Sequence, residues 1–343
     1  MEQFILGGYT RRVNKGLKSI NFDASNGSFH DLEVIAEIDQ PTYQTFSPNG
    51  KFLFSVLAGD DEGGVIAFAN HQDQYQEVAR GFGSGVTGAH IFYRASSQTL
   101  YVSSYHEGAL DVYKFNEDEP SITHVQRVQH SGSSVHKNQD GPHVHFAATR
   151  PQDNDLMFVC DLGTDEVVTY QVDTDGRLTR EQTLAFEPGT GPRHLEFHPE
   201  LPIMYVVGEL ANTTVVVSLE NPEAFEVIQT LDNVPINFQE SSAGAAIRIT
   251  QDGRFLYVST RFHNRLTVFA VDSSKGSLSE IQRIDTQGEI PRDFNLNKTE
   301  DYVIVGHQDS DHLSVFERDA DTGLLTFLNK DTAAEECVCI AKN

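Results

Sequence analysis

The sequence has little cysteine, few basic side chains and no long apolar runs. Its three cysteines, Cys160, Cys337 and Cys339, are an odd number for a disulfide framework, and the last two lie two residues apart in an apolar segment. We therefore expect reduced thiols in a core, and neither disulfide bridges nor a metal or redox site.

Basic side chains are outnumbered two to one, with 25 Lys and Arg against 50 Asp and Glu and a net charge of −25. A surface of this sign repels phosphate backbones and anionic lipids, so neither nucleic acid nor a membrane is expected as a partner. No run approaches the roughly 18 apolar residues of a membrane-spanning helix, and the opening MEQFILGGYTRR lacks the apolar segment of a signal peptide. These absences favour a soluble, cytoplasmic protein.

Common hydrolase motifs and helical patterns are also missing. The chain has neither a G-x-S-x-G nucleophile elbow nor an H-E-x-x-H zinc motif. Helical periodicity is nearly absent, whereas short segments that alternate apolar and polar residues, or are β-branched and aromatic throughout, recur between clusters of Gly, Asn and Asp. The chain is therefore predicted to be all-β.

What the sequence does contain is an internal repeat. A short strand-like segment, a turn, a segment resembling LYV, a polar turn and a V-x-V-F segment recur along the chain. Full copies begin at Thr45, His90, His145, His194, Ile247 and Asp293, and a partial copy without the first strand begins at Gln3. Equivalent positions lie roughly 46 to 57 residues apart, which is the size of a four-stranded propeller blade.

Seven such units predict a seven-bladed β-propeller that spans residues 1–343 as one domain. Closing the ring removes most exposed sheet edges. The first blade lacks its innermost strand, and Cys337–Ala341 is the candidate replacement. We expect this C-terminal strand to join the blade that begins at Gln3 and so to close the ring.

Titratable side chains recur at equivalent points of the repeat. In a propeller the first strand of each blade lines the central channel, so residues at the strand entrances share one mouth, and the turns after the second strands return to that mouth. The residues expected there are His90, His143, His145, Arg193, His194, Glu209, Asn212, Arg261, Arg292, Asp293, Gln308 and Asp309. The alternative is that a solvated mouth gathers charges without any function, but their recurrence in the same repeat position favours a site.

Four segments carry a family resemblance: GPRHLEFHP, GELANTTVVV, IRITQDGRFLYVSTR and PRDFNLNKTEDYVIVGHQDSDHLSVF. They closely resemble the lactonase family of seven-bladed propellers, whose best-known members are bacterial 6-phosphogluconolactonases. The resemblance covers essentially the whole chain. It departs from the family pattern at the basic TRRVNKG turn of the first blade and at the C-terminal EECVCIAKN. Both departures bear on the shape of the pocket more than on the fold.

The resemblance also implies site residues. A fungal relative, the carboxy-cis,cis-muconate lactonizing enzyme, uses a His, two Arg and a Glu at one mouth, and by motif these look like His145, Arg193, Arg261 and Glu209. His143 competes with His145 because this copy of the repeat carries an insertion. The resemblance and the repeat together give a catalytic set of His145, Arg193, Glu209 and Arg261, and a substrate-binding set of His143, His194, Asn212, Arg292 and Gln308.

The reaction implied by the family is hydrolysis of 6-phospho-D-glucono-1,5-lactone to 6-phosphogluconate, a step of the pentose phosphate pathway. The arginines are expected to bind anionic groups and make the mouth positive on an acidic body. Glu209, ionised beside an arginine, is expected to accept a proton from water, and His145 is expected to protonate the leaving oxygen. The expected partner is a small anionic lactone, the expected oligomeric state is a monomer or a weak homo-oligomer, and no cofactor is expected.

Three alternatives stay open at this point. The enzyme could be a lactonase or cycloisomerase for another small acidic lactone, or the propeller could be a non-catalytic binding module, because fold does not fix function. Unrelated propeller lactonases hold a divalent cation at the channel, and Glu209, Asn212 and Asp309 could imitate that ligand set. A deep polar pocket favours an enzyme, whereas an exposed apolar patch at the mouth favours a binding module.

Overall fold

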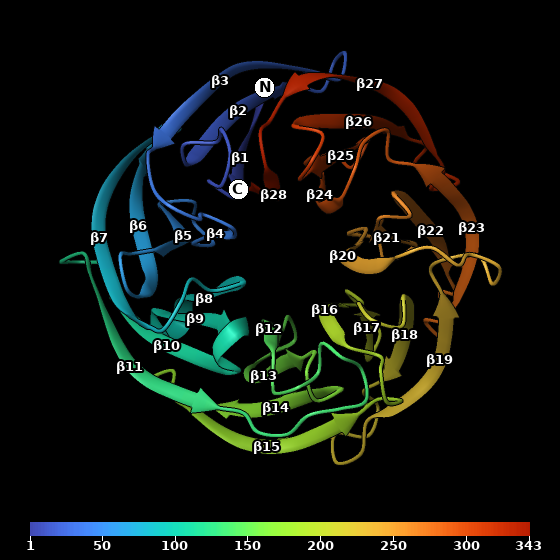
Figure 1. The fold of residues 1–343 in the computed structure, drawn as a ribbon, viewed down its shortest axis with the longest axis horizontal. Coiled ribbons are helices and arrows are strands. Elements are labelled where there is room, and N and C mark those ends of the chain that lie inside the picture. Colours follow the sequence, from blue (N-terminus) through green and yellow to red (C-terminus); the bar gives the residue numbers. More distant parts are fainter.

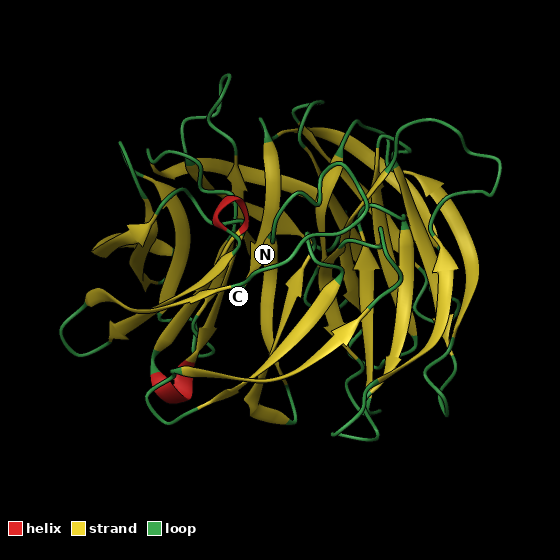
Figure 2. Cartoon of the chain, turned by 60° about the horizontal axis from the view of Figure 1, so that its bottom comes forward, coloured by secondary structure: helices red, strands yellow, loops and turns green.

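Strands of the protein form a closed ring of seven four-stranded antiparallel sheets around a central channel (Figure 1). The structure is a computed structural model that describes residues 1–343, apart from the side chain of Ser84. The strands run between two opposite faces, and loops cover both faces (Figure 2). In the described part of the chain, neither of the two helical turns, η1 (Ala95–Ser97) and η2 (Tyr105–Glu107), has the length and apolarity needed to cross a membrane. The predicted all-β, seven-bladed fold is confirmed.

Each blade is an up-and-down sheet whose first strand lies nearest the channel (Figure 1). In the order from the channel outward, the blades are β28 (Cys337–Lys342), β1 (Glu2–Gly8), β2 (Leu17–Asp23) and β3 (Ser28–Ala36); β4 (Gln44–Phe46), β5 (Phe52–Ala58), β6 (Gly63–His71) and β7 (Gln74–Ser84); β8 (His90–Arg94), β9 (Thr99–Ser104), β10 (Ala109–Asn116) and β11 (Ser121–Gln129); β12 (Val144–Arg150), β13 (Asp153–Asp161), β14 (Glu166–Val172) and β15 (Leu178–Ala185); β16 (Pro192–Phe197), β17 (Ile203–Gly208), β18 (Thr213–Ser218) and β19 (Glu226–Asp232); β20 (Ala243–Ile249), β21 (Phe255–Arg261), β22 (Arg265–Val271) and β23 (Leu278–Asp285); and β24 (Pro291–Leu296), β25 (Tyr302–His307), β26 (His312–Arg318) and β27 (Leu325–Ala333).

The ring closes through the two ends of the chain. Strand β28 pairs antiparallel with β1, with Ile5 opposite Ala341 and Leu6 opposite Ile340, and so supplies the innermost strand of the N-terminal blade. The predicted closure is confirmed. Because this blade is built from both ends of the chain, residues near the N-terminus contact residues near the C-terminus.

The core consists of seven apolar clusters, one between each pair of neighbouring blades. The cluster between the fifth and sixth blades, for example, packs Tyr205 and Val207 of β17 against Leu256 and Val258 of β21. The second and third strands of each blade are therefore mostly apolar on both faces, and polar side chains gather on the innermost strands and in the turns. Cys160, Cys337 and Cys339 are buried in these clusters as free thiols, as the sequence predicts.

Neighbouring blades are also joined by a recurring hydrogen bond. The hydroxyls of Tyr101 and Tyr205, each in the second strand of its blade, donate to the carbonyl oxygens of Gly176 and Gly276 in hairpin turns of the next blade, at 2.8 and 2.9 Å. Both glycines have positive φ, of 80° and 67°, which lets the turn present its carbonyl to the tyrosine. These bonds tie the second strand of one blade to a turn of the next blade.

Candidate active site

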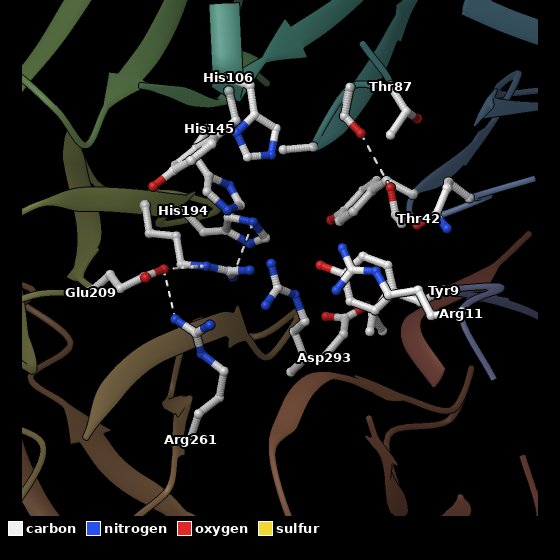
Figure 3. Close-up of a pocket in the computed structure, with 18 residues that line it drawn as sticks. Tyr9, Arg11, Thr42, Thr87, His106, His145, His194, Glu209, Arg261 and Asp293 are labelled. Carbon is white, nitrogen blue, oxygen red and sulfur yellow. Dashed lines mark hydrogen bonds and ion pairs between the residues drawn. The ribbon is translucent and has the colours of Figure 1, made fainter. Parts of the chain in front are cut away.

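A cavity of about 320 Å³ occupies one mouth of the channel, and all seven blades contribute to it (Figure 3). Its lining residues are Tyr9, Arg11, Gln40, Thr42, Tyr43, Thr87, Gly88, Ala89, Tyr105, His106, His145, Arg193, His194, Glu209, Arg261, Arg292, Asp293 and Val338. The set contains His145, Arg193, Glu209 and Arg261, which are up to 116 residues apart in sequence, and also His194 and Arg292. The ring therefore brings together the four residues expected to be catalytic.

Three of the site residues sit in β-bulges at the channel ends of inner strands. In β16, Pro192 lies opposite Gly208 and His194 opposite Val207, so Arg193 is an extra residue without a partner in the ladder. His145 in β12 and Arg292 in β24 occupy the same position of the same irregularity. A bulge bends the strand and re-aims the extra side chain. The same β-bulge therefore occurs in three copies of the repeat, and in each copy the extra residue has a titratable side chain that lines the cavity.

A single carboxylate contacts two guanidinium groups in the lining of the cavity. Glu209 Oε2 lies 3.0 Å from Arg193 Nε and 2.7 Å from Arg261 Nη2. Backbone carbonyls of β20 complete the arrangement, because Arg193 donates to Ala245 at 2.7 Å and Arg261 donates to Gly244 at 3.2 Å. Figure 3 shows Glu209 and Arg261 on one side of the cavity. These contacts place the two guanidinium groups on one carboxylate in the cavity lining.

The cavity carries an excess of positive charge. Four arginines line it against two carboxylates, and one of these, Asp293, is already paired at 3.0 Å with Arg248, which does not line this cavity. Burial opposes ionisation of Glu209, but the arginines outweigh it and hold the pKa of its carboxyl below the usual value. Burial, together with the charges of Arg292 and Arg261, lowers the pKa of Arg193 to about 9, which leaves the guanidinium charged at pH 7. Such a cavity favours an anionic ligand.

Two buried imidazoles form the wall beside these arginines. His145 and His194 are 3% and 2% exposed, and their ring centroids lie 5.1 Å apart. His194 Nε2 lies 3.2 Å from Arg193 Nη1, so it faces a donor and carries no proton itself. Burial lowers the pKa of His145 well below its usual value, and the charges of Arg193, Arg292 and Arg261 lower it further. Both rings are therefore neutral at pH 7.

The whole chain matches the family model described as lactonase, seven-bladed β-propeller, over residues 3–342. The chain belongs to the lactonase family. The 6-phosphogluconolactonase of Bacillus subtilis is 34% identical over 98% of this chain and 96% of its own length. A solved structure from Lactobacillus plantarum shares 34% identity, covers 99% of this chain and 98% of that chain, and superposes with a TM-score of 0.94. The periplasmic gluconolactonase of Pseudomonas aeruginosa shares 26% identity and a TM-score of 0.92, with coverage of 99% and 98%.

Three residues of the predicted substrate-binding set do not line the cavity of this lactonase. His143 stacks on the ring of Tyr105, with ring centroids 4.5 Å apart, and does not itself line the cavity. Asn212 adopts a positive φ of 57° in the turn after β17, where its amide lies 3.4 Å from the Leu210 and Ser242 carbonyls. Gln308 lies in the outer rim, where its carbonyl accepts a bond from Arg12 at 2.9 Å.

The lactonase cavity also contains residues that the sequence did not single out. Tyr105 and His106 follow β9 in the turn η2, and Tyr9 and Arg11 follow β1. Their turns occupy the same repeat position as the turn that carries Glu209, so the register of the repeat could have found them. Tyr9 and Arg11 are harder to find by comparing copies of the repeat, because the first copy is divided between the two ends of the chain.

No group of three or more His, Cys, Asp or Glu side chains within the described part of this lactonase is arranged to hold a metal ion. Of the three residues that could imitate a propeller metal site, Glu209 lines the cavity and is engaged by two guanidinium groups, whereas Asn212 and Asp309 do not line it. The donor set at the cavity is cationic, which does not fit a divalent cation.

A second charged group lies beside the cavity, between it and a separate space along the channel. Arg248 lies 3.0 Å from Asp293 and 3.8 Å from Glu196, and Glu196 lines a separate space of about 210 Å³ farther along the channel. Tyr43 borders both spaces. Burial raises the pKa of Glu196 to about 7, although Arg248 opposes this shift.

Replacing Glu196 with glutamine should make the lactonase more stable above pH 7. Because the folded pKa of Glu196 lies above its unfolded value of 4.5, the folded state binds the extra proton, and stability is lost as the pH rises from about 4.5 to about 7. We expect the free energy of unfolding of Glu196→Gln to be about 1 to 3 kcal/mol higher than that of wild type at pH 8. At pH 4.5 the two values should differ little. Urea unfolding at both pH values measures this, with the exposed Glu200→Gln as the control; equal pH dependence in Glu196→Gln and wild type would contradict it.

Proposed function

We propose that this lactonase hydrolyses 6-phospho-D-glucono-1,5-lactone to 6-phosphogluconate. The observation that carries the proposal is the charge of the cavity, in which Glu209 and Asp293 are the only carboxylates among the described lining residues and four arginines surround them. The phosphate and the developing oxyanion of this substrate need cationic partners at the same time. The Bacillus subtilis relative that bears the name 6-phosphogluconolactonase supports the choice of lactone.

The electrostatics favour a different division of roles from the one the sequence suggests. Glu209 is ionised, and both of its arginine contacts use Oε2, so this carboxylate is engaged in holding the two guanidinium groups. His145 is neutral and can accept a proton. We therefore assign His145 as the general base and Glu209 as the residue that positions Arg193 and Arg261.

The reaction then proceeds in two steps. His145 takes a proton from water, and the resulting hydroxide adds to C1 of the lactone, whose carbonyl electron pair moves onto the oxygen and is stabilised by Arg193 and Arg261. Collapse of this tetrahedral intermediate breaks the bond between C1 and the ring oxygen. The leaving alkoxide takes the proton from His145, whose imidazolium is a strong acid because its pKa is low. The enzyme returns to its starting protonation state.

A second candidate substrate is the unphosphorylated glucono-1,5-lactone. The Pseudomonas aeruginosa neighbour, which shares the fold over the whole chain, is named a gluconolactonase without reference to phosphate. The same His145, Arg193 and Arg261 chemistry serves either lactone. A mouth lined by four arginines and three histidines argues against a module that only binds proteins, which would present an apolar patch there.

The test is hydrolysis of freshly generated 6-phosphogluconolactone, followed by coupled oxidation of the product and corrected for spontaneous opening of the lactone. We expect the wild-type protein to open the phosphorylated lactone with a kcat/KM in the usual enzymatic range of about 10⁴ to 10⁸ M⁻¹s⁻¹. Glucono-1,5-lactone is assayed in parallel. Activity on the unphosphorylated lactone alone would support the second candidate, and activity on neither would overturn the proposal.

A further inference from the structure

The two places where the sequence departs from the family pattern contact each other in the structure. Glu336, from the C-terminal EECVCIAKN segment, is 2% exposed and accepts backbone N–H bonds from the TRRVNKG turn. Its carboxylate oxygens lie 3.1, 2.9, 3.0 and 3.2 Å from the amide nitrogens of Arg11, Arg12, Val13 and Asn14. Burial opposes ionisation of Glu336, but these four bonds hold its pKa below the usual value. The turn is therefore built around one buried carboxylate.

This turn sends its two arginines in opposite directions. Arg12 points to the outer rim, where it forms an ion pair with Asp311 at 2.7 Å and donates to the Gln308 carbonyl. Arg11 lines the cavity instead, with its guanidinium carbon 3.8 Å from the centroid of the Tyr9 ring. Figure 3 shows Tyr9 and Arg11 on the side of the cavity that faces Glu209 and Arg261 from across the channel.

A second cation shares the same ring. The guanidinium carbon of Arg292 lies 5.6 Å from the Tyr9 centroid. Burial lowers the pKa of Arg292, and the charges of Arg261 and Arg11 lower it further. Unlike Arg193 and Arg261, neither Arg11 nor Arg292 has a carboxylate within ion-pair distance among the described residues. Two like charges gathered on one aromatic ring without a counterion repel each other, and a bound dianion would relieve that repulsion.

We propose that Arg11 and Arg292, arranged on the ring of Tyr9, form the subsite for the phosphate of a phosphorylated lactone, and that Glu336 positions this subsite. The inference rests on the proposed lactonase chemistry and adds the basis of its specificity. The cavity then has two ends: Arg193, Arg261 and His145 act on the lactone carbonyl, and Arg11 with Arg292 binds the phosphate. A guanidinium pair suits phosphate because each planar group donates two bonds and stays charged.

The test compares kcat/KM for 6-phosphogluconolactone and for glucono-1,5-lactone in wild type, Arg11→Gln and Arg12→Gln. We expect Arg11→Gln to lower the ratio of the two values by about 10- to 100-fold, as for the loss of charge-assisted hydrogen bonds, mainly through KM for the phosphorylated lactone. Inorganic phosphate should inhibit wild type competitively and the Arg11→Gln variant more weakly. Arg12→Gln, which removes the same charge one residue away and outside the cavity, should keep the wild-type ratio.

Glu336→Gln tests the positioning role. We expect it to raise KM for the phosphorylated lactone with a smaller effect on kcat, because the turn loosens while the hydrolytic residues stay in place. An unchanged substrate ratio in Arg11→Gln, in a wild type that hydrolyses the phosphorylated lactone, would overturn the subsite and leave the proposed function intact. A wild type without activity on the phosphorylated lactone would overturn the proposed function itself, so the two failures are distinguishable.

Discussion

Replacing His145 with asparagine is expected to lower kcat by about 10² to 10⁴, the usual contribution of a general base. The imidazole is buried in the cavity wall and kept neutral by burial and three arginines, so its loss removes the proton acceptor while the arginines remain. Steady-state assays on the lactone that the wild type hydrolyses measure the effect. KM should change little, because the anion-binding arginines are untouched.

His143→Asn is the matched control, because His143 is two residues away, carries the same side chain, stacks on Tyr105 and does not line the cavity. We expect its kcat to stay within a few-fold of wild type. The pH profile separates a base from an acid. If neutral His145 is the base, activity should rise as the pH increases through the lowered pKa of His145. This rise should take place below pH 6.5, and the enzyme should be fully active at pH 7. A fall of activity with rising pH across that range would instead indicate that the protonated form is needed.

Replacing Glu209 with glutamine is expected to lower kcat/KM by about 10² to 10³, comparable to the loss of a group that stabilises the oxyanion. The carboxylate holds Arg193 and Arg261 at 3.0 and 2.7 Å, so both lose their fixed direction and their counterion. Removing one partner of a buried ion pair costs on the order of 3 kcal/mol of folding free energy. Lactonase assays and urea unfolding measure the two effects.

A test with added anions separates a positioning role from general damage. In Glu209→Gln the cavity gains one net positive charge, so inorganic phosphate should raise the melting temperature of the variant more than that of wild type. The exposed Glu187→Gln, in the loop before β16, removes the same charge outside the cavity and should behave as wild type in both assays. Full activity in Glu209→Gln would show that the arginines need no shared carboxylate.

The repeat explains why so much of this site could be predicted from the sequence. His145, Arg193 and Arg292 stand at one position of the repeat, and Glu209 and Arg261 at another, so ring closure alone brings them to one mouth. The prediction of strand β28 as the closing strand rests on the same counting, because one copy lacked its first strand. Register did not resolve single side chains. Asn212 and Gln308 lie in the same kind of turn after the second strand as Glu209, yet the Asn212 amide contacts carbonyls of the turn and Gln308 contacts Arg12.

The sequence by itself determined the ring, its closure and the kinds of side chain that reach the channel, because these follow from the spacing of strands along the chain. Only the tertiary structure decided which groups are charged and what they contact. His145 is neutral because blades distant in sequence bury it and place arginines beside it, and Arg11 enters the cavity because Glu336, 325 residues away, holds its turn. Burial and charge separation depend on distances in space, and a one-dimensional pattern does not contain those distances.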